Sequence, residues 1–192
     1  MHVFLTGERQ IGKSRALNRA AELSGLRLAG FRTRFLTRER GSSSLYMLPA
    51  ASDGPLDEYH TVARLEEGRM RPLTERFDTL GAEILRNSRQ EAGALILMDE
   101  CGHLEKNAMV FQQEIRNCLD GETPVLGILR KDQPWHDFIK RHPKVTVLEV
   151  TKDNRNEVAE KILELLEADG RTSVNREDGC RSRPREEGDR SS

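Results

Sequence analysis

Residues 7–14 of this chain read Gly7-Glu8-Arg9-Gln10-Ile11-Gly12-Lys13-Ser14, which fits the pattern G-x-x-x-x-G-K-[ST]. The glycines allow the backbone to curl tightly, so that successive N–H groups point at phosphate oxygens. The lysine reaches the β- and γ-phosphates, and a serine hydroxyl is a ligand that Mg²⁺ accepts. The stretch therefore predicts a phosphate-binding loop, and we expect all eight residues and the next one, Arg15, to bind a nucleotide.

The flanking sequence favours this interpretation. Residues 2–6, His-Val-Phe-Leu-Thr, form a short apolar and β-branched run that is typical of a buried strand. After the loop, apolar residues recur at helical spacing, and Gly25 stands where a helix commonly ends. The alternative is an ordinary glycine-containing turn before a surface helix, but the strand, loop and helix together favour a nucleotide site.

A second informative stretch is residues 94–100, which read Ala-Leu-Ile-Leu-Met-Asp-Glu. A continuous apolar run of this length predicts an inner parallel strand, buried on both faces. Carboxylates at its carboxyl end are typical of the strand that completes a phosphate-loop site. We expect Asp99 to hold Mg²⁺, directly or through water, alongside Ser14. We expect Glu100 to act as the general base toward water, the alternative being two acidic residues that solvate a strand end.

Two cations follow the next predicted inner strand, residues 124–129. Ligands of open α/β sheets bind at the carboxyl ends of strands, so Arg130 and Lys131 either face the γ-phosphate or form a solvated pair. Trp135, shortly after them, is interpreted as a packing residue, with stacking on a base as the alternative.

The rest of the chain predicts one α/β domain, residues 1–169. A hairpin is expected from residues 28–36 and 45–48, whereas residues 50–72 show a strand pattern only at 61–65. Apolar periodicity predicts helices from Phe77 to about Gln90, and with Leu104, Phe111 and Ile115 on one face up to Gly121. Asp153 is the expected N-cap of the last helix, and residues 170–192 are expected to form a disordered polar tail.

Composition excludes several other classes of protein. Charged residues make up 33% of the 192 residues, yet the formal net charge is −1, and aromatic residues make up 5%. We therefore expect no nucleic-acid partner. The three cysteines are too scattered for a disulfide framework or zinc site. With no leader and no long apolar run expected, the prediction is a cytoplasmic protein without membrane association.

Together these motifs resemble the family of small nucleoside-triphosphatases first described from thermophiles, which includes the human cancer-related nucleoside-triphosphatase. The resemblance covers roughly residues 1–168. It is carried by Leu5-Thr6-Gly7 through Lys13-Ser14, by Met98-Asp99-Glu100-Cys101-Gly102 through Glu105, by Val150-Thr151-Lys152-Asp153-Asn154-Arg155, and by Gly30-Phe31-Arg32-Thr33.

The resemblance implies a three-layer RecA-like sandwich that hydrolyses nucleoside triphosphates with little base selectivity. It also implies that Asn154 and Arg155 lie near the nucleotide. We therefore expect Mg²⁺-dependent hydrolysis of substrates such as ATP or GTP, with Lys13 and Glu100 as catalytic residues. Arg130, Lys131 or Arg155 is expected to neutralise developing charge. The alternatives are a nucleoside or small-metabolite kinase, and a nucleotide-gated switch with an unknown protein partner.

Overall fold

A computed structural model describes residues 1–37 and 42–168 of the chain. The predicted polar tail, residues 170–192, lies outside the described residues, and so does the predicted domain boundary at residue 169.

One eight-stranded sheet organises the molecule, with the strand order β5-β4-β3-β2-β6-β7-β1-β8. The strands are β1 (His2–Gly7), β2 (Arg27–Thr37), β3 (Ser43–Pro49), β4 (Thr61–Glu66), β5 (Arg69–Pro72), β6 (Ala94–Cys101), β7 (Val125–Leu129) and β8 (Val145–Val150). The neighbours from β2 through β6, β7 and β1 to β8 are parallel, and β3, β4 and β5 are added antiparallel. The carboxyl ends of five parallel strands therefore meet at one edge.

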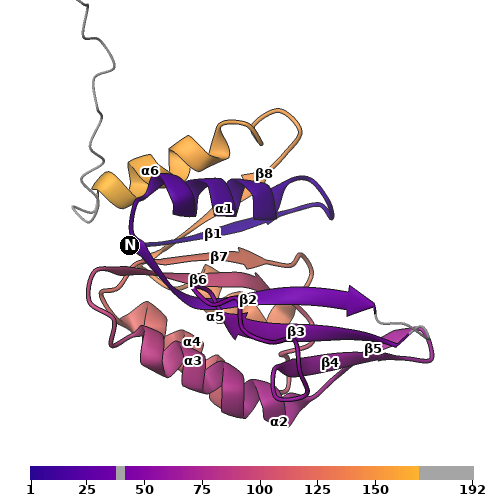
Figure 1. The fold of residues 1–192 in the computed structure, drawn as a ribbon. Coiled ribbons are helices and arrows are strands. Elements are labelled where there is room, and N and C mark those ends of the chain that lie inside the picture. The colour runs from indigo at the N-terminus through magenta and orange to yellow at the C-terminus, as the bar shows by residue number, and fades with distance from the viewer. Residues whose placement is uncertain (38–41, 169–192) are drawn as a thin grey trace, which may run out of the picture.

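Helices cover both faces of the sheet, which confirms the predicted three-layer α/β architecture (Figure 1). They are α1 (Lys13–Leu23), α2 (Thr74–Arg76), a π-helical turn η2 (Phe77–Gly81), α3 (Ala82–Ser88), α4 (Met109–Asp120), a 3₁₀ turn η3 (Pro134–His136), α5 (Asp137–Lys140) and α6 (Val158–Ala168). Helices α1 and α6 pack on one face, where Leu17 and Ile162 belong to the same buried cluster as Val3. Helices α3 and α4 pack on the other face.

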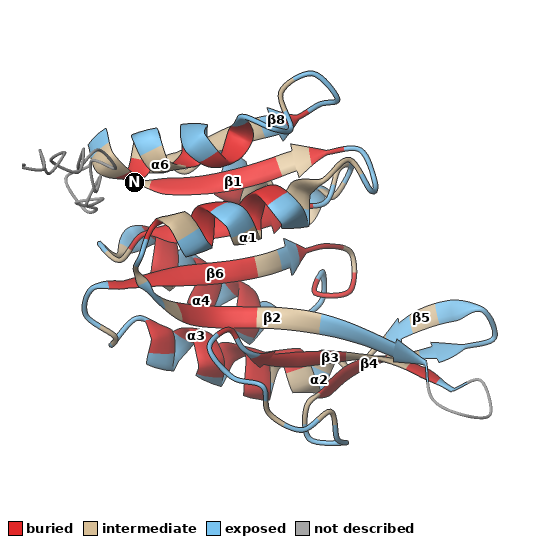
Figure 2. Cartoon of the chain, turned by 45° about the horizontal axis from the view of Figure 1, so that its top comes forward, coloured by how far each residue is buried: buried red, intermediate tan, exposed pale blue. Residues whose placement is uncertain are grey.

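The antiparallel strands form an extension that reaches past the layered core. Residues 29–31 of β2 are buried, whereas residues 34–37 are exposed, as Figure 2 shows by the change from red through tan to pale blue. The predicted hairpin is present as β2 and β3, with Phe31 opposite Pro49 and Thr37 opposite Ser43. Strands β4 and β5 extend it within residues 50–72, where only one strand was predicted. Strand β5 is too short to show a reliable period, because it has only four residues and none of them is fully buried.

The helix predicted from Phe77 to about Gln90 begins earlier, at Thr74, ends at Ser88 and is divided into three pieces. The π-helical turn η2 interrupts it between α2 and α3. At Gly81, an added Cβ atom would lie 2.9 Å from the Phe111 ring, so glycine lets that ring pack against the turn. The ring centroid of Phe111 also lies 5.8 Å from that of Phe77 and 5.6 Å from that of Phe31. A long-range contact thus shapes this segment, which local periodicity does not reveal.

Two predictions at helix starts were wrong. Leu104 was expected on the stripe of α4, but the helix begins at Met109 and Leu104 lies in the preceding turn. Asp153 was expected to cap α6, which begins only at Val158. Asn154 instead bonds locally, because its Oδ1 accepts from Thr151 N at 2.9 Å and its Nδ2 donates to the Glu149 carbonyl at 2.8 Å.

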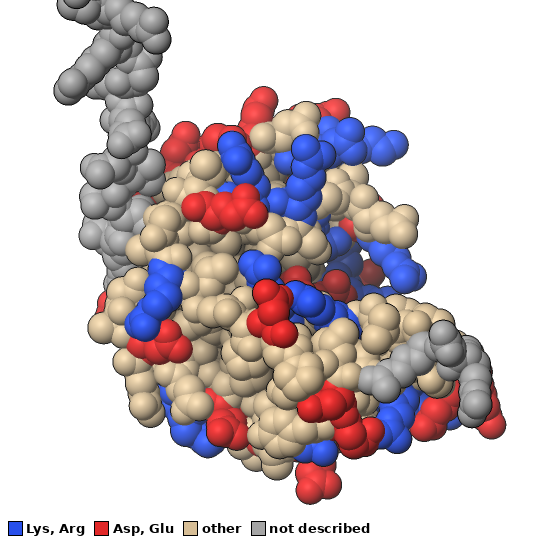
Figure 3. All heavy atoms as spheres, in the orientation of Figure 1, with Lys and Arg blue, Asp and Glu red and all other residues tan. Residues whose placement is uncertain are grey.

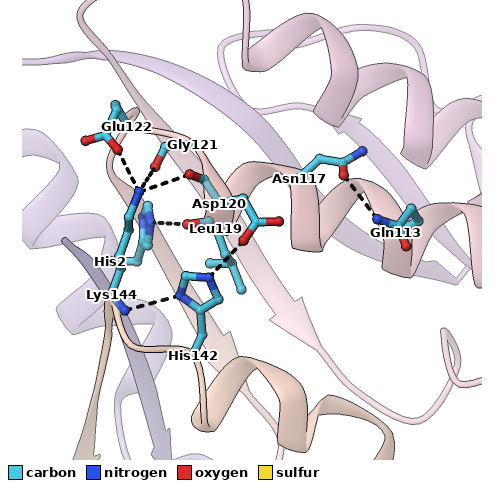
Figure 4. A network of polar contacts seen from close by, with 9 residues as sticks. All are labelled: His2, Gln113, Asn117, Leu119, Asp120, Gly121, Glu122, His142 and Lys144. Carbon is cyan, nitrogen blue, oxygen red and sulfur yellow. Dashed lines mark hydrogen bonds and ion pairs between the residues drawn. The ribbon is translucent and has the colours of Figure 1, made fainter.

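A network of polar contacts lies at the amino ends of the parallel strands, on the side of the sheet away from the carboxyl ends (Figure 4). His2 is fully buried, with its Nε2 2.9 Å from the Leu119 carbonyl oxygen and its Nδ1 accepting from Val125 N at 3.1 Å. Burial lowers the pKa of His2 to about 4. Nearby, His142 Nε2 donates to Asp120 Oδ1 at 3.2 Å. A neutral His2 therefore ties the start of β1 to the end of α4.

Candidate active site

The loop between β1 and α1 is built on backbone conformations that few residues adopt. Gly7 has a φ angle of +142°, and an added Cβ atom there would lie 2.5 Å from the Val150 carbonyl oxygen of β8. Gly12, just before α1, has a φ angle of +115°. Gln10 is also left-handed, at +61°. The glycine spacing of the motif thus corresponds to a close strand contact and to a left-handed entry into the helix.

The start of α1 presents donors to an anion. Gly12 is the N-cap, and within the described chain no side chain caps this helix end. The first turn contains Lys13, Ser14 and Arg15, with no acidic residue. Unsatisfied N–H groups and the helix dipole make such an end favourable for phosphate.

Lys13 folds back over its own loop. Its Nζ donates to the Gly7 carbonyl oxygen at 2.9 Å and to the Glu8 carbonyl oxygen at 2.7 Å. Burial lowers the pKa of Lys13, and the negative charges of Glu100 and Glu8 oppose that shift. The ammonium is thus held at the loop by carbonyl oxygens that phosphate oxygens can replace.

A cleft of about 660 Å³ lies over the loop. Figure 3 shows the surface hollowed between the upper part of the molecule and the β2–β5 extension, with acidic and basic side chains inside. The predicted nucleotide-binding residues Gly7, Glu8, Arg9, Gln10, Gly12, Lys13, Ser14 and Arg15 line this cleft, together with Glu100, Arg130, Lys131 and Asp132. The neighbouring Ile11 is packed against the apolar core below α1 and is not part of the lining.

The two carboxylates at the end of β6 are directed to different neighbours. Glu100 lines the cleft with Lys13. Asp99 is not among the lining residues, and its Oδ2 accepts hydrogen bonds from Thr33 N at 2.9 Å and from Thr33 Oγ1 at 3.0 Å. The alternation of a strand separates the two side chains. Glu100 is therefore the β6 carboxylate that faces the phosphate loop, and the assignment of Asp99 to a metal stays a prediction.

The three candidate cations have different surroundings. Lys131 Nζ forms ion pairs with Glu8 and Glu149, each at 2.9 Å, and these contacts raise its pKa. Arg130 lines the cleft beside Glu100, and its guanidinium contacts the Nδ1 atom of His103 at 3.0 Å. Within the described residues Arg130 forms no ion pair with a carboxylate, whereas Lys131 forms two, so the Arg130 charge is the less neutralised of these two.

Asn154 and Arg155 lie in the loop after β8, next to the cleft. Arg155 lines a second hollow of about 400 Å³ together with Arg15, Arg19 and Asn156. Arg15 lines both this hollow and the main cleft. Asn154 lines neither, and its side chain shapes the loop through local hydrogen bonds.

The donor set in the cleft suits Mg²⁺. No group of three or more histidine, cysteine or acidic residues in the described ranges forms a metal cage. Mg²⁺ on a phosphate loop needs no such cage, since one or two protein oxygens, substrate phosphates and water complete its shell. The Ser14 hydroxyl and the Glu100 carboxylate line the same cleft, with Asp99 adjacent in β6.

Glu105 is a buried carboxyl that motif reasoning did not assign. It is 3% exposed, and its Oε2 accepts from Gly102 N at 3.0 Å. Burial raises the pKa of Glu105 to about 7. Burial also raises the pKa of the adjacent Cys101 thiol well above its usual value, which agrees with packing rather than nucleophilic chemistry. Trp135 Nε1 donates to the Gly102 carbonyl oxygen at 2.6 Å, so Trp135 braces the same turn.

Comparison with known proteins gives a consistent assignment. The NTPase family profile matches residues 2–163. The nucleoside-triphosphatase THEP1 of Natranaerobius thermophilus is 25% identical over 170 residues, 86% of this chain and 96% of the relative. The human cancer-related nucleoside-triphosphatase is 28% identical over 186 residues, covering 87% of this chain and 97% of the relative.

A solved structure agrees with the fold. The crystal structure of THEP1 from the hyperthermophile Aquifex aeolicus is similar with a TM-score of 0.68, covering 87% of this chain and 99% of that one at 23% identity. No helix among residues 1–37 and 42–168 is long and apolar enough to cross a membrane. From the family profile and these likenesses, the chain belongs to the NTPase family.

Proposed function

We propose that this protein hydrolyses nucleoside 5′-triphosphates to the diphosphate and phosphate, in a Mg²⁺-dependent reaction with broad base specificity. One observation carries the proposal: Glu100 lines the same cleft as Lys13 and the amides of the phosphate loop. A carboxylate at that place takes a proton from water as the water attacks the γ-phosphate. Relatives that are named nucleoside-triphosphatases support the same reaction.

Each cleft residue has a proposed task. Lys13 exchanges its loop carbonyls for phosphate oxygens, and the loop amides hold the β-phosphate. Arg130 neutralises charge on the transferring phosphoryl group, because Lys131 is already held by two carboxylates. Ser14 would hold Mg²⁺, with Asp99 reaching the ion through water. The ion would supply positive charge that stabilises the transferring phosphoryl group.

The proposed base specificity follows from the hollow beside α1. Extending from the phosphate loop past Arg15, a nucleoside reaches the hollow that Arg155 lines. Its lining includes the exposed side chains of Arg15, Arg19, Arg155 and Asn156. Strong discrimination between bases needs buried polar groups that the wrong base leaves unpaired. Exposed arginines bind ribose or base without that penalty, so we expect ATP, GTP, CTP and UTP to be accepted.

The test is phosphate release from these four nucleotides without an added acceptor, with Mg²⁺ and with EDTA. We expect release from all four with similar kcat/KM and none with EDTA. Release from one nucleotide alone contradicts the broad specificity. Nucleotide binding without any release contradicts hydrolysis and favours the nucleotide-gated switch.

A further inference from the structure

Another cavity, distinct from the hollow that Arg155 lines, adjoins the cleft on the side of the extension; we call it the second cavity. Its volume is about 440 Å³, and it shares Arg9, Glu100 and Arg130 with the cleft over the phosphate loop. Its other walls come from β2 to β5 and from the turn after β6. Glu100, the proposed base, therefore stands at the junction of two compartments.

The walls of this second cavity are mainly apolar. Its apolar lining consists of Leu104 from the turn and, from the extension, Phe35, Leu45, Leu65 and Met70. Phe35 is 57% exposed and Leu65 is 38% exposed, so these side chains keep a face open to a ligand. A water molecule that attacks phosphate needs no apolar walls, whereas a cavity of this size and lining suits the body of a small molecule. Hydrolysis alone therefore does not explain an apolar cavity beside Glu100.

We propose that this cavity binds a phosphoryl acceptor, a small alcohol with an apolar body, whose hydroxyl group takes the place of water at Glu100. The proposal rests on the proposed function, because it uses the same base and the same γ-phosphate. The nucleoside extends toward Arg155 on the other side of the loop. The second cavity shares Glu100 with the cleft but no residue with the hollow that Arg155 lines, so we place the acceptor on the side of the γ-phosphate away from the nucleoside, as in-line transfer requires.

The transfer balances without any further reactant. The acceptor oxygen forms a bond to the γ-phosphorus, and the bond from that phosphorus to the β,γ-bridging oxygen breaks. The electron pair of the broken bond leaves on the nucleoside diphosphate, and the hydroxyl proton passes to Glu100. Arg9 and Arg130, which line both compartments, bind the phosphoryl group between them. The products are a phosphate monoester and a nucleoside diphosphate.

The experiment measures how the phosphoryl group partitions between water and an alcohol. The protein turns over ATP with Mg²⁺ in the presence of 2-phenylethanol or, at equal concentration, of glycerol, and ³¹P NMR measures each phosphate ester and free phosphate. The phenyl ring fits the apolar walls, while glycerol has no apolar body. We expect the ratio of 2-phenylethyl phosphate to phosphate to exceed that of glycerol phosphate to phosphate by about tenfold or more.

Two substitutions, at leucines that are 38% and 37% exposed, test whether the alcohol binds in this cavity. Leu65→Arg places a charge in the cavity wall, whereas Leu36→Arg changes a residue that is 37% exposed, also belongs to the extension and does not line the cavity. Because the readout is a ratio of products, it does not depend on how much of each variant folds. We expect Leu65→Arg to reduce the ester ratio to that of glycerol and Leu36→Arg to keep it.

The possible outcomes separate this inference from the proposed function. Phosphate release without excess 2-phenylethyl phosphate overturns the acceptor site and leaves hydrolysis intact. An excess that Leu65→Arg does not reduce also overturns it, and so does 2-phenylethanol that binds without transfer. Ester formation with no free phosphate supports the acceptor site and contradicts the hydrolase.

Discussion

The buried carboxyl of Glu105 predicts an unusual dependence of stability on pH. The perturbation is Glu105→Gln, which removes the ionisable group while its amide oxygen still accepts from Gly102 N. Glu105 is nearly inaccessible, so its charged form is poorly solvated in the folded chain and burial raises its pKa to about 7 from an ordinary 4.5. Glutamine stays neutral at every pH.

The sign and size of the effect follow from proton linkage. Below pH 4.5, Glu105 is protonated in both the folded and the unfolded chain, and ionisation costs nothing. As pH rises to about 7, the unfolded chain loses this proton first, so the wild type loses stability. One pKa unit corresponds to about 1.4 kcal/mol, which gives a loss of about 3 kcal/mol above pH 7. Glu105→Gln is free of that loss.

The assay is urea unfolding followed by circular dichroism, with EDTA and without nucleotide, at pH values from 4.5 to above 7. The free energy of unfolding of Glu105→Gln should equal that of the wild type near pH 4.5 and exceed it by about 3 kcal/mol above pH 7. Glu83→Gln, at an exposed position on α3, controls for the loss of one carboxylate. A difference that stays constant over this range, or that turns against the variant as pH rises, refutes the reasoning.

Three further predictions concern the polar network around His2 and the site. Replacing His2 by Gln should cost stability at neutral pH, and the advantage of the wild type should shrink by up to about 3 kcal/mol between pH 6.5 and 4 in urea unfolding, because protonation of a group with a lowered pKa opposes folding. Gly7→Ala should lower the free energy of unfolding by about 1–3 kcal/mol or more and weaken nucleotide binding in calorimetry, since its Cβ atom meets the Val150 carbonyl. Arg130→Ala should lower kcat by about 10²- to 10³-fold in phosphate-release assays, whereas Lys131→Ala should change it much less; the reverse order contradicts the roles assigned to them.

Much of the fold and of the phosphate site was predictable because its signals are local. The spacing of Gly7, Gly12 and Lys13 already specifies a strand–loop–helix unit. The apolar run that ends in Asp99 and Glu100 specifies a buried parallel strand with carboxylates at its carboxyl end. The structure places the unit and that strand in one sheet, with β7 between β1 and β6.

The surroundings of these residues depend on contacts between distant parts of the chain. Asp99 meets Thr33 only because β2 pairs with β6. Glu105 is buried by its place in the compact turn after β6. Its spacing of three residues from Gly102 is at most a weak sequence signal of the hydrogen bond that Gly102 N donates to it. The second cavity requires the whole β2–β5 extension, whose last strand has no clear pattern. Motif spacing does not encode such packing.

The most direct test of the central claim is single-turnover phosphate release by Glu100→Gln, with nucleotide affinity measured on the same protein. Glutamine keeps the shape of the side chain but cannot accept the proton from water. We predict that Glu100→Gln binds ATP with Mg²⁺ within a few-fold of the wild type and releases phosphate about 10²- to 10⁴-fold more slowly. Release at the wild-type rate would contradict the role of Glu100 and, with it, the proposed mechanism.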